Sequence, residues 1–389
     1  MLRQSSPAYF GGCVKSEELK VQQRTDTDES PLDATPDDLL LISGFDREKQ
    51  IPVTVEPGPN DLQTVQQVIT ESPASALIKP MGLVIAPSRD ARYKPSPELT
   101  KAVLDRIAER TVLARAKSST LVLVAHPDDE AIGAGGLLAG MPDAVIAHVT
   151  DGAPRDDKYA QAKGFPTRES YARARRREVV NALAHVGITP ERCRGLGYVD
   201  GEASLQLIEL VFDVADLMNE VRPEIVITHP YEGGHSDHDA TAFAVHLACG
   251  VLRRDNVPTP LVLELTSYHN FSGQRRVFSF LPFLGTDSRT IQLTENEKIL
   301  KSRMYGEFLS QKVCLERFPI AIERFRPAPR YQFTAAPHEG PLDYERYCTV
   351  ISGAEWRDNA GKALQTLRTR RRRFVQALGL TGSAMRILG

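Results

Sequence analysis

Through the middle of the chain, short apolar runs alternate with longer segments of helical character. Three runs are almost continuously apolar, as expected for strands buried on both faces of a parallel sheet: TLVLVAH (residues 120–126), AVIAHVTDG (144–152) and EIVITHP (224–230). A shorter strand is expected in CRGLGYVD (193–200). Helices are expected between and after these strands, at residues 169–188, 204–223 and 238–252. Strands and helices alternating at this spacing predict βαβ units, hence an α/β fold with an open parallel sheet and helices on both faces.

The pattern is weaker on both sides of this region. Residues 1–36 are polar, and the next sixty or so residues are rich in proline and turn residues, until a better helix starts near Ser96. After residue 261 we expect a strand in LVLELTSYH, a helix capped by Thr294, and a long C-terminal helix. We therefore divide the chain into a partly disordered N-terminal extension of unknown role (1–115), a catalytic domain (116–350) and a C-terminal helical tail (351–389).

The composition is that of an ordinary globular protein. Hydrophobic residues make up 41% and charged residues 25%, and the formal net charge of −2 argues against general nucleic-acid binding. We expect no integral membrane segment, because no apolar run reaches about 18 residues. The N-terminus lacks the apolar core of a secretory signal. Five scattered cysteines without metal or redox spacing predict reduced thiols in a cytoplasmic protein.

One basic run needs two interpretations. RTRRRRF (368–374) has the charge to bind a polyanion. The simpler interpretation is a solvated basic face on an amphipathic helix, and we prefer it.

Polar clusters follow two of the expected buried strands. His126, Asp128 and Asp129 come directly after the first strand, in AHPDDE. His229 and the sequence HSDH (235–238) come after the strand at residues 224–230. Open α/β sheets bind their ligands at the carboxyl ends of strands. If these two strands are neighbours in the sheet, both clusters would line one crevice.

The residue types in these clusters suit a metal site. His126 and Asp129 are three residues apart, so a tight strand-to-helix turn can aim both at one centre, and His238 can supply a third ligand. Two histidines and one carboxylate are typical of catalytic zinc (Zn2+) and leave a position open for water. The same ligands also suit ferrous iron (Fe2+) or another divalent cation.

The remaining polar residues suit catalysis around such a metal. Asp128 stands beside a ligand but must point elsewhere, where it can act as a general base. His235 can face the substrate. Asp237 can orient an imidazole by accepting a hydrogen bond from its second nitrogen.

Each cluster alone also has a simpler explanation. PDD after a strand is often a helix N-cap, and HSDH is often a polar loop. The glycines of AIGAGG (131–136) have the wrong spacing for a dinucleotide loop and are better explained by close helix packing. His229 is ambiguous, since it can simply end its strand. Two such clusters in one βα domain nevertheless favour a metal site.

Together these motifs resemble the LmbE-like, or PIG-L, family of metal-dependent de-N-acetylases. AHPDDE is followed about a hundred residues later by GHSDHDAT, in which Ser236 stands where the family usually has proline. VTDG (149–152), the Arg175 and Glu178 pair of RRREVV, and EFLSQ (307–311) are similar to weaker motifs of the family. The resemblance covers roughly residues 120–347.

The resemblance implies a fold and a set of roles. The fold would be a Rossmann-like three-layer sheet. Family members remove acyl groups, usually acetyl, from the 2-amino group of N-acetylglucosamine compounds, which implies a small-molecule amino-sugar substrate and zinc or ferrous iron. The ligands would be His126, Asp129 and His238, with Asp128 as the base. His235 would stabilise the oxyanion and protonate the leaving amine, and Arg175 would contact the sugar.

Two other functions remain open from the sequence. One is an amidase that cleaves a larger acyl amide of an amino-sugar or thiol conjugate. The other is a non-catalytic sugar- or nucleotide-binding module with a vestigial metal site. A spare carboxylate and a spare histidine beside the ligands speak against the second. The sequence does not indicate the substrate or the oligomeric state.

Overall fold

The computed structural model describes residues 97–108, 119–283, 286–347 and 350–377. Most of the N-terminal extension expected at residues 1–115 lies outside these described residues. Within them the chain forms a seven-stranded sheet and a separate two-stranded sheet.

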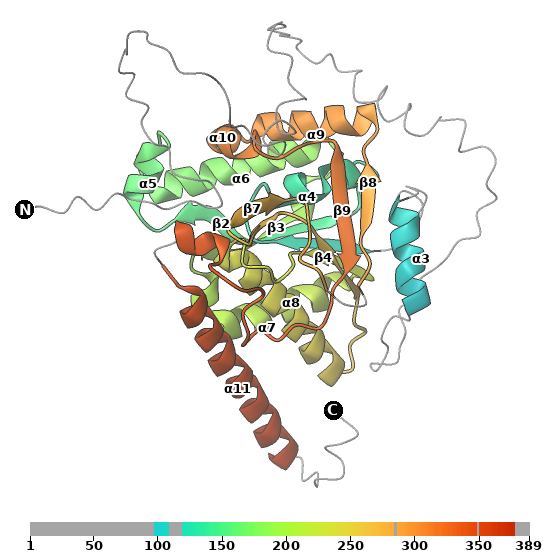
Figure 1. Cartoon of the computed structure of the whole chain (residues 1–389), viewed down its shortest axis with the longest axis vertical. Coiled ribbons are helices and arrows are strands. Elements are labelled where there is room, and N and C mark those ends of the chain that lie inside the picture. The colour runs from blue at the N-terminus through green and yellow to red at the C-terminus, as the bar shows by residue number, and fades with distance from the viewer. Residues whose placement is uncertain (1–96, 109–118, 284–285, 348–349, 378–389) are drawn as a thin grey trace, which may run out of the picture. The chain divides into compact units, whose positions relative to one another are not determined.

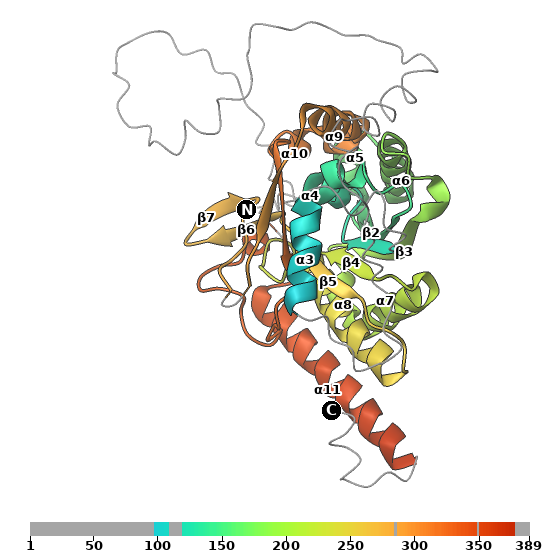
Figure 2. The same ribbon diagram turned by 90° about the vertical axis from the view of Figure 1, so that its right-hand side faces the viewer.

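The seven-stranded sheet has the strand order β3-β2-β1-β4-β5-β9-β8. Its strands are β1 (Thr120–Val124), β2 (Val145–Pro154), β3 (Cys193–Asp200), β4 (Ile225–Thr228), β5 (Leu261–Leu265), β8 (Arg289–Gln292) and β9 (Ile322–Pro327). The first five strands pair in parallel, as the apolar runs predict. The strands at one edge differ from the expected all-parallel sheet, because β9 pairs antiparallel with both β5 and β8. Beside the main sheet, β6 (Tyr268–Phe271) and β7 (Gln274–Val277) form an antiparallel hairpin (Figure 2).

The helices are α3 (Pro97–Ala108), α4 (Asp129–Leu138), α5 (Asp157–Ala162), α6 (Arg168–Ala184), α7 (Leu207–Val221), α8 (Ser236–Arg254), α9 (Glu295–Glu307), α10 (Lys312–Leu315) and α11 (Gly353–Ala377). Six of these helices (α3, α6, α7, α8, α9 and α11) lie where the sequence predicts them, and α4, α5 and α10 were not among the predicted ranges. Short 3₁₀ turns are η2 (Pro190–Arg192), η3 (Ala203–Leu205), η4 (Leu309–Gln311) and η5 (Asp343–Arg346). The predicted cap of α9 is confirmed, because Thr294 and Glu297 form a reciprocal capping box.

The sheet lies between two layers of helices (Figure 1). Alternate residues of β1 face opposite layers. Val122 and Val124 pack with α4, α6 and α9 in one core, and Leu121 and Leu123 pack with α7 and α8 in the other. Because both faces of the central strands are covered, nearly every residue in them is apolar. The expected three-layer α/β fold is confirmed.

Helices at both ends of the described chain join these cores. Val103 and Ile107 of α3 are buried in the same core as α4, and Asp105 accepts a hydrogen bond from Arg289 of β8 at 2.8 Å. Trp356 of α11 is fully buried in the opposite core and donates from Nε1 to the carbonyl of Ser236 at 3.1 Å. The domain limits expected at residues 115 and 350 stay predictions. The basic run at 368–374 lies in α11, but its side chains from residue 370 onward are outside the described part.

Two cysteines, Cys193 and Cys249, are buried and free. Reduced thiols throughout the chain and a cytoplasmic location stay predictions. Among the described residues, no helix is long and apolar enough to cross a membrane.

Candidate metal centre

The two polar clusters meet at the carboxyl ends of neighbouring strands. β1 and β4 pair directly, with Leu121 opposite Val226, so the turns that follow them lie side by side. After β1 the chain continues to β2 on one side of this pair, and after β4 it continues to β5 on the other side. Such a switch in strand order is where open α/β sheets bind their ligands.

The structure brings His126, Asp129 and His238 together. One possible ligand atom from each lies within 4.8 Å of the others, and all three residues are buried. Asp129 is central: its Oδ2 lies 3.1 Å from His126 Nδ1, and its Oδ1 lies 3.3 Å from His238 Nε2. Burial lowers the pKa of His238 to about 3, so its imidazole is neutral and keeps a lone pair for an ion. Two imidazoles and a carboxylate at this spacing can hold a divalent cation.

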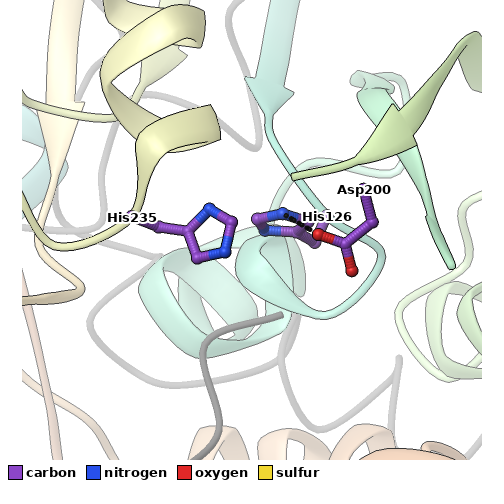
Figure 3. Close-up of side chains that lie close together, drawn as sticks. All are labelled: His126, Asp200 and His235. Carbon is purple, nitrogen blue, oxygen red and sulfur yellow. Dashed lines mark ion pairs between the residues drawn. The ribbon is translucent and has the colours of Figure 1, made fainter. Parts of the chain in front are cut away.

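The second nitrogen of His126 faces two further carboxylates. Nε2 lies 3.2 Å from Asp200 Oδ1 (Figure 3) and 3.3 Å from Asp237 Oδ2. Asp237 is itself fixed, because it accepts hydrogen bonds from the backbone N–H groups of Gly201 at 2.6 Å and Ala203 at 3.1 Å. Carboxylates that hold the far nitrogen of a ligating histidine are a common feature of metal sites. The geometry therefore places Asp237 where it can orient His126.

Asp200 was not expected from the sequence. It ends β3 in the sequence GYVDG, so the criterion that found the other clusters, a polar residue at the carboxyl end of a strand, also applies to it. Together with His126 and His235 it forms a second group of possible ligands (Figure 3). The two groups share His126.

Asp128 has an unusual backbone and an unusual partner. Its φ is 138°, a left-handed conformation that costs free energy for a residue other than glycine, and its N–H donates to Glu130 at 3.1 Å. It stands at the N-cap of α4, as the simpler interpretation of PDD expects, but its side chain makes no cap hydrogen bond. Instead Arg175 Nη1 lies 3.3 Å from Asp128 Oδ2. Burial raises the pKa of Asp128 to about 7, although Arg175 opposes this effect.

Arg175 reaches Asp128 from α6, across Gly152. The Arg175 side chain is only 2% exposed, and a Cβ at residue 152 would lie 2.6 Å from its Nε. One turn later, Glu178 accepts hydrogen bonds from the N–H of Ser310 at 2.8 Å and its hydroxyl at 2.6 Å. The three weaker motifs of the sequence thus meet around one helix: Gly152 makes room for Arg175, and Glu178 holds the segment at 307–311. A contact between Arg175 and a sugar stays a prediction.

His235 is the N-cap of α8. Its Nδ1 accepts a hydrogen bond from the backbone N–H of Asp237 at 3.2 Å, which leaves Nε2 to carry the proton. Burial lowers the pKa of His235 to about 4, which favours this neutral form. Its ring lies edge-on to His126, with 4.5 Å between the ring centres. The HSDH sequence is therefore the buried first turn of a helix, and the polar-loop interpretation is wrong.

His229 and His148 lie outside both ligand groups. His229 stacks on His238, with 3.8 Å between ring centres, and its Nε2 accepts from the N–H of Ala125 at 3.1 Å. The ambiguous histidine therefore supports a ligand and belongs to neither group. His148 is a buried core histidine whose Nε2 lies 2.9 Å from Glu130 Oε2.

Comparison with known proteins points to one family. The family model described as PIG-L, GlcNAc-PI de-N-acetylase, matches residues 121–249, which include both polar clusters. A probable N-acetyl-alpha-D-glucosaminyl L-malate deacetylase 2 of Bacillus cereus is 30% identical over 151 residues, which are 38% of this chain and 67% of that protein. Its Bacillus subtilis counterpart is 27% identical over 154 residues, or 39% of this chain and 69% of that protein. The zinc-inhibited form of teicoplanin deacetylase Orf2 is 18% identical with a TM-score of 0.44, and the match covers 55% of this chain and 99% of that one.

Proposed function

Because the chain belongs to the PIG-L family of de-N-acetylases, we propose that it is a metal-dependent hydrolase that removes an N-acetyl group from an amino sugar. The substrate would be a small molecule or glycoconjugate with a sugar of the N-acetylglucosamine type. The named relatives are probable deacetylases of N-acetyl-alpha-D-glucosaminyl L-malate, which supports this substrate class.

One observation carries the proposal. His126, Asp129 and His238 can provide ligand atoms to one ion, and two further groups, Asp128 and His235, stand beside them without belonging to that set. A site that only bound a metal for stability would need no additional carboxylate or histidine. Hydrolysis uses both side chains: one takes a proton from water, and the other assists the departure of the leaving group.

The donor set fits a divalent cation, and zinc is our first choice. His126, Asp129 and His238 would hold it, with Asp200 and Asp237 fixing the far side of His126. When bound there, such an ion polarises a carbonyl oxygen and lowers the pKa of water. Identical ligands also suit ferrous iron.

We assign Asp128 as the general base. Burial raises its pKa to about 7, so near neutral pH it can both lose and accept a proton. Arg175 opposes the rise and keeps a share of the carboxylate ionised. The buried guanidinium therefore acts on the base rather than only on a sugar.

We assign His235 as a hydrogen-bond donor to the reacting group. Since its Nδ1 accepts from the N–H of Asp237, a neutral ring carries hydrogen on Nε2, which can donate to a developing oxyanion or to the departing amine. We assign the neutral imidazole the role of a hydrogen-bond donor that keeps its own proton, whereas the family resemblance implies a residue that protonates the leaving amine. The proton that Asp128 takes from water would pass to the leaving nitrogen, and acetate and a free amine are released.

Acetate release tests the proposal. Purified protein would be assayed with N-acetylglucosaminyl compounds, including the malate conjugate, before chelation, after chelation, and after zinc or ferrous iron is restored. We expect activity that disappears with the chelator and returns with metal. A parallel assay with a bulkier N-acyl group separates a deacetylase from a general amidase. Protein that binds one metal ion but releases no acid from any compound contradicts the proposal.

A further inference from the structure

The loop that carries His235 is held by a segment far along the chain. We call residues 341–347 the strap. It lies outside the region matched by the family model, which ends at residue 249. The strap contacts Gly233 and Gly234, the two residues that precede His235.

Two hydrogen bonds join the strap to this loop. The N–H of Asp343 donates to the carbonyl of Gly233 at 2.8 Å, and the Tyr347 hydroxyl donates to the carbonyl of Gly234, also at 2.8 Å. Gly233 has a φ of +71°, and Leu342 would lie 2.7 Å from a Cβ there. Gly233 is therefore required by the fit of the strap and by its backbone conformation.

The opposite side of the loop is closed by the β6–β7 hairpin. A Cβ at Gly234 would lie 2.0 Å from the backbone oxygen of Tyr268, so the backbone of the loop packs directly against the hairpin at this residue. The hairpin also holds the strap, because Asn270 donates to the carbonyl of Pro341 and Arg346 donates to the carbonyl of Gly273, each at 2.7 Å. The loop before His235 is thus clamped between two elements that are tied to each other.

Tyr347 joins the strap to the loop beside His235. It is buried, and its ring centre is 6.4 Å from that of His235. Its hydroxyl fixes the carbonyl of Gly234, which belongs to the peptide unit that carries the backbone nitrogen of His235. That peptide sets the direction in which the imidazole leaves the chain.

We infer that Tyr347 is a positioning residue for the deacetylation reaction: it holds the Gly234–His235 peptide so that His235 Nε2 points at the reacting amide. The inference rests on the proposed function. An error of about 1 Å in a reacting group can reduce the rate by about a hundredfold. Loss of one hydrogen bond to the supporting peptide should cost less, about tenfold in kcat.

The test is Tyr347→Phe, which keeps the ring and removes the hydroxyl. We expect kcat to fall about tenfold, while KM and metal content stay at wild-type values. Tyr344→Phe is the matched control, since it removes another buried strap hydroxyl, one that has no hydrogen-bond partner within the described structure. The control should retain wild-type kcat.

A double-mutant cycle separates positioning from general support of the fold. In a His235→Gln background the phenol has no imidazole to position, so adding Tyr347→Phe should reduce kcat no further. A similar additional loss in that background overturns the inference, and so does a single variant with unchanged kcat. Parallel loss of metal and activity in Tyr347→Phe also overturns it, because the hydroxyl would then support the metal site. Wild-type protein without deacetylase activity would instead contradict the proposed function itself.

Discussion

Substitution of Gly152 by alanine should disable the general base without touching a metal ligand. Gly152 lies in β2 with a φ of +66°. A Cβ there would lie 2.6 Å from Arg175 Nε, 2.9 Å from its Nη2 and 2.9 Å from Pro127 Cδ. Contacts this short force the guanidinium to move, and its 3.3 Å contact with Asp128 is lost.

This substitution has two separate effects, one on stability and one on the pKa of Asp128. The left-handed backbone costs an alanine on the order of 1 kcal/mol of stability. Loss of the neighbouring cation removes the effect that holds the pKa of Asp128 down, and such neighbours are worth about one to three pKa units. Since a base must be ionised to accept a proton, the acid limb of the pH–rate profile should move to higher pH. Near pH 6, kcat/KM should fall by about ten- to a thousandfold, with partial recovery above pH 8.

Gly197→Ala is the matched control. Gly197 also has a positive φ, +83°, but no atom lies within 4 Å of the position its Cβ would take. Both variants should keep wild-type metal content. Gly197→Ala should show only the stability cost of the left-handed backbone, to which Gly152→Ala adds the cost of its clashes in thermal unfolding. Only Gly152→Ala should show the shifted pH–rate profile. If its profile and turnover match those of wild type, Arg175 does not control Asp128, and the reasoning is refuted.

Three further predictions concern the base, the ligands and a buried ion pair. Asp128→Asn should keep metal but reduce kcat by about a thousandfold, and wild-type acetate release from this variant would rule out Asp128 as the base. His238→Ala should lose metal, whereas Asp200→Asn should bind it about ten- to a hundredfold more weakly; the reverse pattern, measured by metal analysis, would place the ion between His126, Asp200 and His235. Burial alone would lower the pKa of His148, but Glu130 raises it to about 10, so its contribution to stability is complete below pH about 6.5 and is lost as the pH rises toward 10. The difference in unfolding free energy between wild type and His148→Gln should therefore shrink by on the order of 3 kcal/mol between pH 6 and pH 9.5 in urea titrations, and a constant difference would contradict the ion pair.

Hydrophobic pattern predicted the centre of the sheet better than its edge. The central strands are covered on both faces, so burial leaves a continuous apolar run that can be recognised. β9 reads IERFRP, and its charges suggest an exposed segment. Glu323 and Arg326 are in fact buried: Glu323 pairs with Lys301 at 2.9 Å, and Arg326 pairs with Glu264 at 2.7 Å. A pattern of apolar and polar positions cannot show that a charge is buried with its partner, so this strand was missed.

The sequence also did not predict the parts of the candidate site that come from distant segments of the chain. His126, Asp128 and Asp129 are adjacent in sequence, and the expected parallel sheet allowed His238 to join them across the β1–β4 pair. Asp200 comes from β3, which is separated from β1 by β2. It reaches His126 where the β2–β3 pairing is irregular, with register shifts after His148 and after Thr150. Such bulges bend a strand and redirect its side chains, and they arise from the packing of the whole sheet. Neither the bend nor the strap at 341–347 has a local signal, because each depends on contacts between residues that are far apart in the chain.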